Sequence, residues 1–215
     1  MTSLRSGVKL TLMKKLTFYF LVSLFFITNV SADQLVVSDI KLGTKLTDYF
    51  STAQISKYNI NDRVSNTPFY SYEGKYSYIE IMKEEDVFKD DYDYVQIVYV
   101  NKNDEVHYIS AVTDFLFDHS EGLNECIEYR DRKISEYKRK KILKGLKKEI
   151  TNLTHNFTGT KEKGVWFDSP LLKFNIGFVC LTYPKSANID NDFRLDYNTF
   201  EVNDWLMEQK KKASN

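Results

Sequence analysis

Residues 94–117 read YVQIVYVNKNDEVHYISAVTDFLF, and this stretch decides the fold. Two runs rich in β-branched and aromatic residues flank Asn101–Asp104, which is a cluster of turn-forming residues. The pattern predicts an antiparallel hairpin with strands over 94–100 and 106–117. Because apolar side chains alternate onto both faces of the first strand, we expect that strand to lie inside a sheet. A hairpin alone is only marginally stable in water, so its apolar row needs a cover.

A long amphipathic helix after the hairpin is the expected cover. Apolar residues recur at spacings of three and four from Leu123 to Tyr137, and the charged run continues to Lys148. Acidic residues dominate the opening turns and basic residues the closing turns, which is the order that the helix dipole favours. We therefore predict a helix over 121–148, with Gly145 as a weak point that costs about 1 kcal/mol against alanine.

The remaining patterns predict short helices near both ends of the exported chain and further strands. Ser51–Gln54 fits a capping box, Thr44 is a candidate N-cap, and Thr199 is expected to cap a closing helix. The predicted fold class is α+β, with an antiparallel sheet of about six or seven strands and the long helix packed on one face. Strands are expected over 67–72 and 75–82 as a hairpin, then over 164–168, 171–183 and 193–197, with a loop over 150–163.

The first 32 residues have the pattern of a secretory signal peptide. Basic residues between Arg5 and Lys15 precede an apolar run over 16–30, and Val30-Ser31-Ala32 is a small-residue cleavage site. Cleavage after Ala32 would leave a single domain over 33–215, exported to the periplasm of a bacterium. The alternative is an uncleaved anchor, but the run is shorter than the roughly 20 residues that a membrane span needs.

Loss of the signal peptide removes basic residues only, so the exported chain is mildly acidic. A mild negative charge supplies no general attraction to nucleic acid or to an anionic membrane. We therefore expect no nucleic-acid partner and, at most, peripheral membrane contact.

The chain has two cysteines, Cys126 and Cys180, and both follow the predicted cleavage site. An even number of cysteines in an oxidising compartment favours a disulfide. A reactive thiol or a metal site is the alternative, but there is no Cys-x-x-Cys pair and no histidine at metal-ligand spacing. The bridge is predicted to join the start of the long helix to a late strand.

No catalytic, cofactor-binding or metal-binding pattern is present in the sequence. It lacks a Gly-x-Ser-x-Gly elbow, a His-Glu-x-x-His helix and a glycine-rich phosphate loop. Acidic residues crowd over 84–93 without the EF-hand order, which favours a solvated loop over a calcium site.

Two functional hypotheses follow. The favoured one is a non-catalytic binding or envelope-accessory protein, whose partner is an envelope protein or a small ligand. The alternative is a hydrolase of an envelope or exogenous polymer that uses carboxylates of the acidic loop, since paired carboxylates are brought together by folding and not by spacing.

The basic run over 138–148 is the strongest local signal for a surface contact. Seven of its eleven residues are lysine or arginine, and Ile142, Leu143 and Leu146 are interleaved with them. Such a helix can attach a protein peripherally to an anionic surface, although a solvated helix end is the commoner explanation. The contact residues would be Lys138, Arg139, Lys141, Lys144 and Lys148.

The chain also resembles a group of small exported proteins of AT-rich bacteria that have no established activity. The shared features lie across most of the exported chain: Ile40-Lys-Leu-Gly43, Asp48-Tyr-Phe50, Tyr94-Val-Gln-Ile97, Glu125-Cys126-Ile127, an aromatic strand that ends at Cys180, Arg194-Leu195 and Asn203-Asp-Trp-Leu206. The resemblance implies an exported location and a shared fold, and it implies no activity.

Overall fold

The computed structural model of the 215-residue chain describes residues 36–37, 39–60, 75–85, 92–115, 121–154, 159–187 and 190–213. The chain divides into two compact units, residues 1–30 and 31–215, and every described residue belongs to the second unit. The predicted signal peptide, its cleavage site after Ala32 and the predicted strand over 67–72 lie outside the described residues. Among the helices that are described, none is long and apolar enough to cross a membrane.

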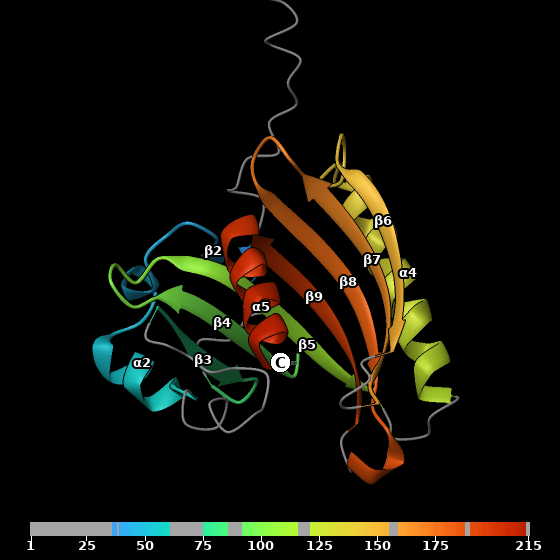
Figure 1. The fold of residues 1–215 in the computed structure, drawn as a ribbon, viewed down its shortest axis with the longest axis horizontal. Coiled ribbons are helices and arrows are strands. Elements are labelled where there is room, and N and C mark those ends of the chain that lie inside the picture. Colours follow the sequence, from blue (N-terminus) through green and yellow to red (C-terminus); the bar gives the residue numbers. More distant parts are fainter. Residues whose placement is uncertain are drawn as a thin grey trace, which may run out of the picture. The chain divides into compact units, whose positions relative to one another are not determined.

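Seven strands form one antiparallel sheet, which confirms the predicted α+β class with an antiparallel sheet (Figure 1). The order across the sheet is β3-β4-β5-β9-β8-β7-β6, so the last strand of the chain lies in the middle. Two further short strands pair with each other, β1 (Val36–Val37) and β2 (Ile40–Lys41). The seven strands are β3 (Tyr76–Met82), β4 (Tyr94–Val100), β5 (Val106–Phe115), β6 (Lys147–Thr154), β7 (Lys161–Ser169), β8 (Phe174–Thr182) and β9 (Asn191–Thr199).

The predicted hairpin is β4 and β5, and β4 lies inside the sheet as expected, between β3 and β5. Its turn contains Asp104 at φ 58°, a left-handed conformation that aspartate tolerates better than most residues. Ile97 pairs with Ile109 and Val95 with Ala111, and all four side chains are buried. The alternating apolar pattern therefore forms the core of this half of the sheet.

The described helices are α2 (Thr52–Tyr58), α4 (Glu121–Arg139) and α5 (Phe200–Ala213), with short 3-10 turns at Leu46–Asp48 and Lys185–Ala187. The capping box is confirmed: the Gln54 N–H donates to Ser51 Oγ at 3.3 Å, and the Ser51 N–H donates to Gln54 Oε1 at 2.9 Å. Thr199 caps α5 as predicted, because its Oγ1 accepts the Val202 N–H at 3.4 Å. The assignment of Thr44 as an N-cap is wrong by one position, since Lys45 precedes the 3-10 turn.

The predicted helix over 121–148 is too long, and the predicted loop over 150–163 is wrong. The helix ends at Arg139, a turn occupies 140–145, and β6 begins at Lys147. Lys141 and Gly145 have φ values of 61° and 80°, and such left-handed residues end a helix. The predicted basic helix over 138–148 is therefore not one helix. It consists of the end of α4, the turn over 140–145 and the start of β6.

On one face of the sheet, α4 contacts β5, β8 and β9. The Tyr129 ring meets Phe193 edge to face, with the centroids 5.0 Å apart, and the Tyr137 ring meets Phe178 at 5.2 Å. The predicted disulfide between Cys126 and Cys180 is confirmed, with both residues buried. Aromatic contacts and the bridge together attach α4 to the middle strands.

On the other face, α5 covers the half of the sheet made by β3, β4 and β5. Val202 and Trp205 pack with the buried residues Tyr76, Tyr78 and Val98. In Figure 1, α5 lies in front of the sheet and α4 lies behind it. Strands β8 and β7 lie to one side of α5 in this view, and α5 does not cover them. The face of β7, β8 and β9 on the same side as α5 carries several buried polar and charged residues.

Candidate functional site

Strand β9 carries a row of charged residues through the middle of the sheet. Asp192, Arg194 and Asp196 alternate with Phe193, Leu195 and Tyr197, which are fully buried and belong to the core. Because side chains alternate along a strand, the three charged residues share the face on which α5 lies. Asp192 is 2% exposed and Asp196 is 7% exposed. Charged side chains are rarely buried to this degree unless they are paired or serve a function.

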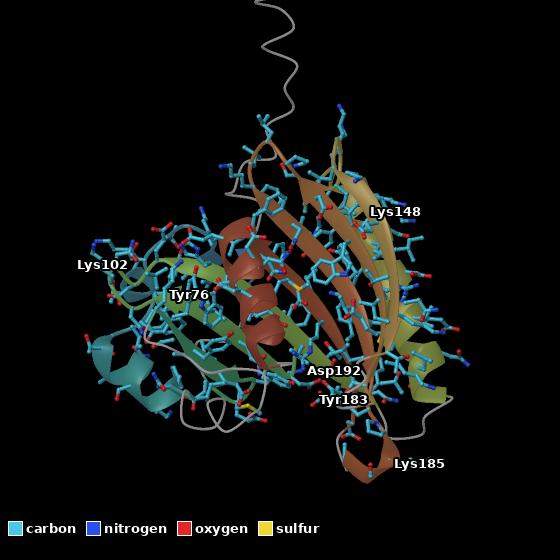
Figure 2. The ribbon with its side chains drawn as sticks, in the orientation of Figure 1. Tyr76, Lys102, Lys148, Tyr183, Lys185 and Asp192 are labelled. Atoms are coloured by element: carbon cyan, nitrogen blue, oxygen red, sulfur yellow. A yellow bond between two sulfur atoms is a disulfide. The ribbon has the colours of Figure 1, made fainter. Side chains whose placement is uncertain are left out.

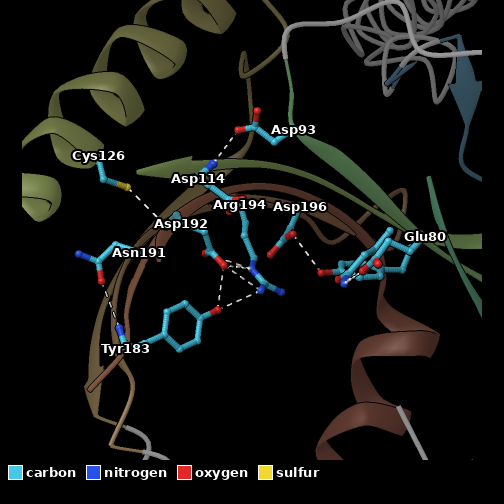
Figure 3. Close-up of polar contacts among 11 residues, drawn as sticks. Glu80, Asp93, Asp114, Cys126, Tyr183, Asn191, Asp192, Arg194 and Asp196 are labelled. Atoms are coloured by element: carbon cyan, nitrogen blue, oxygen red, sulfur yellow. Dashed lines mark hydrogen bonds and ion pairs between the residues drawn. The ribbon is translucent and has the colours of Figure 1, made fainter. Parts of the chain in front are cut away.

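The first part of the row is a closed cluster of three side chains (Figure 3). Arg194 Nη2 donates to Asp192 Oδ2 at 2.9 Å and to Tyr183 Oη at 3.1 Å, and the Tyr183 hydroxyl donates to Asp192 Oδ2 at 2.8 Å. Burial alone would lower the pKa of Arg194, but the negative charge of Asp192 raises it well above its usual value. Nη1 of Arg194 makes no hydrogen bond to any described residue, so among these residues its two N–H donors have no acceptor.

The second part of the row is Asp196, which lies on the far side of the Arg194 guanidinium from Tyr183 in Figure 3. The Tyr108 hydroxyl donates to Asp196 Oδ1 at 3.0 Å. Burial raises the pKa of Asp196 to about 6, although hydrogen bonds and the positive charge of Arg194 act to lower it. Asp196 therefore lacks a cation that would fully compensate its charge.

Asp114 extends the negative charge onto the neighbouring strand β5, where it pairs with Asp192 in the sheet register. Partial burial, followed by repulsion from Asp192 and Asp93, raises the pKa of Asp114 to about 6. In the described part of the chain, Arg194 is the one basic side chain that hydrogen-bonds to Asp114, Asp192 or Asp196, and it contacts Asp192. The face thus has more carboxylates than cations.

Trp166 of β7 supplies an aromatic surface beside Asp196. Its indole lies across Gly177 of β8, where an added Cβ would come within 2.5–2.8 Å of three indole carbons. Gly177 pairs with Trp166 on one side and with Asp196 on the other. Glycine is therefore required at this position, because only the bare backbone lets the indole approach the sheet this closely beside the carboxylate strand.

Replacing Gly177 with alanine is expected to displace the Trp166 indole. Overpacking of this kind costs about 1–3 kcal/mol, and a displaced indole becomes more exposed to water. The test is the fluorescence emission maximum in a Trp205→Phe background, where Trp166 is the remaining tryptophan of the two in the chain. A red shift is expected, whereas an unchanged maximum would show that the indole does not depend on Gly177.

Two buried asparagines lie two residues further along β8 and β9 than Gly177 and Asp196. Asn175 of β8 and Asn198 of β9 are Cα partners in the register and are 7% and 4% exposed. The Oδ1 atom of each is buried without a hydrogen-bond partner in the structure. Asn198 lies two residues from Asp196 and so shares its face. A buried carbonyl oxygen without a donor is uncommon in a folded protein and requires an explanation.

The site predicted from the sequence is elsewhere. Lys138, Arg139, Lys141, Lys144 and Lys148 are all exposed, as the surface-contact hypothesis requires, but they come from the end of α4, the following turn and β6. Figure 2 shows Lys148 on β6, apart from Asp192 and Tyr183.

The acidic stretch over 84–93 is described in part. Glu85 forms an ion pair with Lys57 at 2.7 Å, and Asp93 Oδ2 accepts the Asp114 N–H at 2.8 Å. Residues 86–91 lie outside the described residues. Within the part of the chain that is described, no three histidine, cysteine, aspartate or glutamate side chains are grouped in a way that could hold a metal ion.

A cavity of about 760 Å³ lies along α4 and not over the β9 row. All its described lining residues belong to residues 128–139 of that one helix, so it brings no groups together from different elements. We assign no role to it.

Sequence reasoning missed Asp192, Arg194, Asp196 and Trp166 as site residues. The available signal was the alternation of charged residues with Phe193, Leu195 and Tyr197, because such a strand buries one face and still places charges on the other.

Comparison with known proteins assigns no family to this chain. It matches no family model, and neither a curated protein nor a solved structure is significantly similar to it.

Proposed function

We propose that this protein is a non-catalytic, exported binding protein that takes a small polar ligand on the sheet face around Asp192, Arg194, Asp196 and Trp166. The observation that carries the proposal is the buried charged row on β9 with unused hydrogen-bonding groups beside an aromatic surface. Ligand sites combine apolar or aromatic walls with a few placed polar groups. The disulfide is consistent with the predicted export to an oxidising periplasm.

The stability cost of this row also supports binding. A buried carboxylate whose pKa is raised destabilises the fold at neutral pH. An apolar residue at position 196 would avoid that cost, as the alternating apolar residues of β9 do on the other face. Residues that reduce stability in this way are typical of functional sites.

Binding is favoured over catalysis because the described residues offer no convincing nucleophile and base. A hydroxyl–imidazole pair does occur, since His107 Nδ1 lies 3.1 Å from Thr199 Oγ1. However, His107 is buried at 7% exposure, and the same Thr199 oxygen caps α5 by accepting the Val202 N–H. We interpret this pair as a structural contact of the helix start.

The proposal is tested by an amide and indole NMR screen of the protein against amino acids, sugars and small amines. At least one class is expected to shift resonances of β5, β7, β8 and β9 together with the Trp166 indole. The Arg194→Lys variant should bind more weakly because it loses the planar fork that holds Asp192. Shifts confined to other parts of the molecule, or none with any class, would contradict the proposal.

The exposed basic residues favour a second function, peripheral attachment to anionic lipid. Of the seven basic residues between 138 and 148, Lys140 forms an ion pair within the described residues, with Glu136 at 2.6 Å. Ile150, on β6 beside them, is 69% exposed and offers an apolar contact. Each basic side chain near an anionic membrane contributes about 1 kcal/mol, and salt weakens the attraction.

Vesicle sedimentation tests this second function. The protein is expected to bind phosphatidylglycerol vesicles and to leave phosphatidylcholine vesicles unbound. Reversing the charges of Lys141 and Lys144 to glutamate should weaken binding by roughly two to three orders of magnitude. The matched control is the double variant Lys45→Glu with Lys102→Glu, which makes the same change in net charge at two exposed lysines outside the basic run. Equal binding by both variants would contradict attachment through this run.

A further inference from the structure

Three buried side-chain oxygens close to Asp196 have no hydrogen-bond partner among the described residues: Asn175 Oδ1, Asn198 Oδ1 and Ser110 Oγ. The two amide oxygens can only accept, and the Ser110 hydroxyl lies opposite Asp196, where it can donate to the carboxylate. The group that these oxygens lack is therefore a donor, and this decides what kind of ligand fits there. Asn175 Oδ1 and Asn198 Oδ1 are buried and accept no hydrogen bond, and the neighbouring Asp196 carboxylate accepts one from Tyr108. A carboxylate has more acceptor capacity than one hydrogen bond uses. The position therefore offers one negative charge and several lone pairs to a group that only donates.

The spacing of these positions along and across the strands leaves room for a single donor atom between the side-chain oxygens. Asp196 and Asn198 are two positions apart on β9, which separates their Cα atoms by about 6.8 Å on the same face. If one ligand nitrogen donates to the side-chain oxygens of both residues, two hydrogen bonds of about 2.8 Å each cover most of this distance. Asn175 lies directly across the strand pair from Asn198 and supplies a third direction.

We propose that the ligand of this face carries a primary ammonium group, which lies between the Asp196 carboxylate and the amide oxygens of Asn175 and Asn198. This inference rests on the proposed binding function and names the class of its ligand. A primary ammonium has three donors, no acceptor and a full positive charge. It satisfies both amide oxygens and compensates Asp196 at the same time.

Other ligand groups fit less well. A hydroxyl donates a single hydrogen and has no positive charge. A ligand with a hydroxyl would therefore displace water from the Asp196 carboxylate without compensating its negative charge. A quaternary ammonium carries the charge but has no N–H to donate. A metal ion would need more ligands, and the described residues form no metal-binding group here.

Trp166 and Arg194 complete the recognition of such a ligand. The Trp166 indole lies beside Asp196 across Gly177, where its face attracts a cation and its area packs against the carbon skeleton. Arg194 Nη1, two residues along β9 from Asp196, has donors left for an acceptor at the other end of the ligand. The site therefore favours a small amine that also carries a hydroxyl or carboxylate group.

The experiment uses two matched pairs of probes, n-butylammonium with 1-butanol and glucosamine with glucose. Within a pair, the members differ by an ammonium group in place of a hydroxyl. Dissociation constants are measured from NMR shifts of the Trp166 indole and the β9 amides. In at least one pair we expect the ammonium member to bind roughly tenfold tighter or better, because a hydrogen bond to a charged group is stronger than a neutral one.

The outcomes separate this inference from the function on which it rests. If the neutral members bind the face as well as the ammonium members, the ammonium inference is overturned and the binding function stands. If neither ammonium probe shifts these resonances, the inference is also overturned, and the wider ligand screen decides the binding function by itself.

Asp196→Asn is the matched variant, because it keeps the shape and an acceptor for Tyr108 while it removes the charge. It is expected to abolish the preference for ammonium over hydroxyl within each pair. Asp131→Asn on α4 removes one negative charge from an exposed position and should leave the preference unchanged. A preference that survives in Asp196→Asn would contradict the assignment of the ammonium to this carboxylate.

Discussion

Replacing Cys126 and Cys180 together with alanine is expected to lower the free energy of unfolding by about 4 kcal/mol. The bridge joins residues 54 positions apart, and this segment contains most of α4, all of β6 and β7, and most of β8. Without it, the unfolded chain gains conformational freedom, and the start of α4 loses its covalent tie to β8. Urea denaturation of the oxidised protein and the double variant measures the difference.

The wild-type protein under reducing conditions is the control for this measurement. It should unfold at nearly the same urea concentration as the double variant, since both lack the bridge and differ by two buried sulfur atoms. A difference of less than about 1 kcal/mol between the oxidised and reduced wild type would contradict the stabilising role of the bridge.

Replacing Asp196 with asparagine is expected to raise the free energy of unfolding by about 3 kcal/mol at pH 8. The pKa of Asp196 is raised to about 6 in the folded protein, against about 3.9 for an unperturbed aspartate, and each unit corresponds to about 1.4 kcal/mol. The asparagine carries no charge and still accepts the Tyr108 hydrogen bond.

The sign of this effect depends on pH. Well below pH 4 the carboxyl group is protonated in both the folded and the unfolded state, so it imposes no charge penalty, and near pH 4, where the unfolded group is about half ionised, the penalty is still small. As pH rises towards and through 6, the unfolded state ionises first, and the wild type loses stability. The variant lacks this loss, so the two proteins should differ little at pH 4 and most at pH 8.

The groups that face Asp196 are Ser110 and Tyr108 from β5 and Arg194 and Asp192 from β9, and the variant retains all of them. The control is again Asp131→Asn, for which no comparable change between pH 4 and pH 8 is expected. If the Asp196→Asn variant is less stable than the wild type at pH 8, the charge of Asp196 stabilises the fold. The proposal that Asp196 lowers stability and serves ligand binding would then be contradicted.

Local patterns predicted the middle of the fold because the relevant residues pair with near neighbours in the sequence. The hairpin of β4 and β5 has a turn cluster between two strongly apolar strands, and the capping box at Ser51 depends on residues three positions apart. The disulfide followed from the number of cysteines and the predicted export. These features need no knowledge of the other strands.

The end of the long helix and strand β6 were not predictable from the same patterns. Residues 147–154 form an edge strand with most side chains exposed, so burial imposes no alternation of apolar and polar residues. The charged run from Lys138 to Lys148 is compatible with a helix locally. It becomes a turn and a strand because β7 offers a partner for pairing.

The candidate site was missed because it depends on the order of strands across the sheet. Trp166, Gly177 and Asp196 are far apart in the sequence, and the register of β7, β8 and β9 brings them into one row. The last strand was expected to be short, yet β9 lies centrally between β5 and β8, where its charged residues are buried. Sequence spacing carries no information on such a contact.

The most direct test of the account is the pKa of the Asp196 carboxyl group, measured by carbon NMR with and without n-butylammonium. The account predicts a pKa of about 6 in the free protein and a lower value once the ammonium binds, because an adjacent positive charge favours the ionised form. An ordinary aspartate pKa of about 3.9 that does not respond to the amine would contradict the claim that this buried carboxylate lacks a cation and binds one.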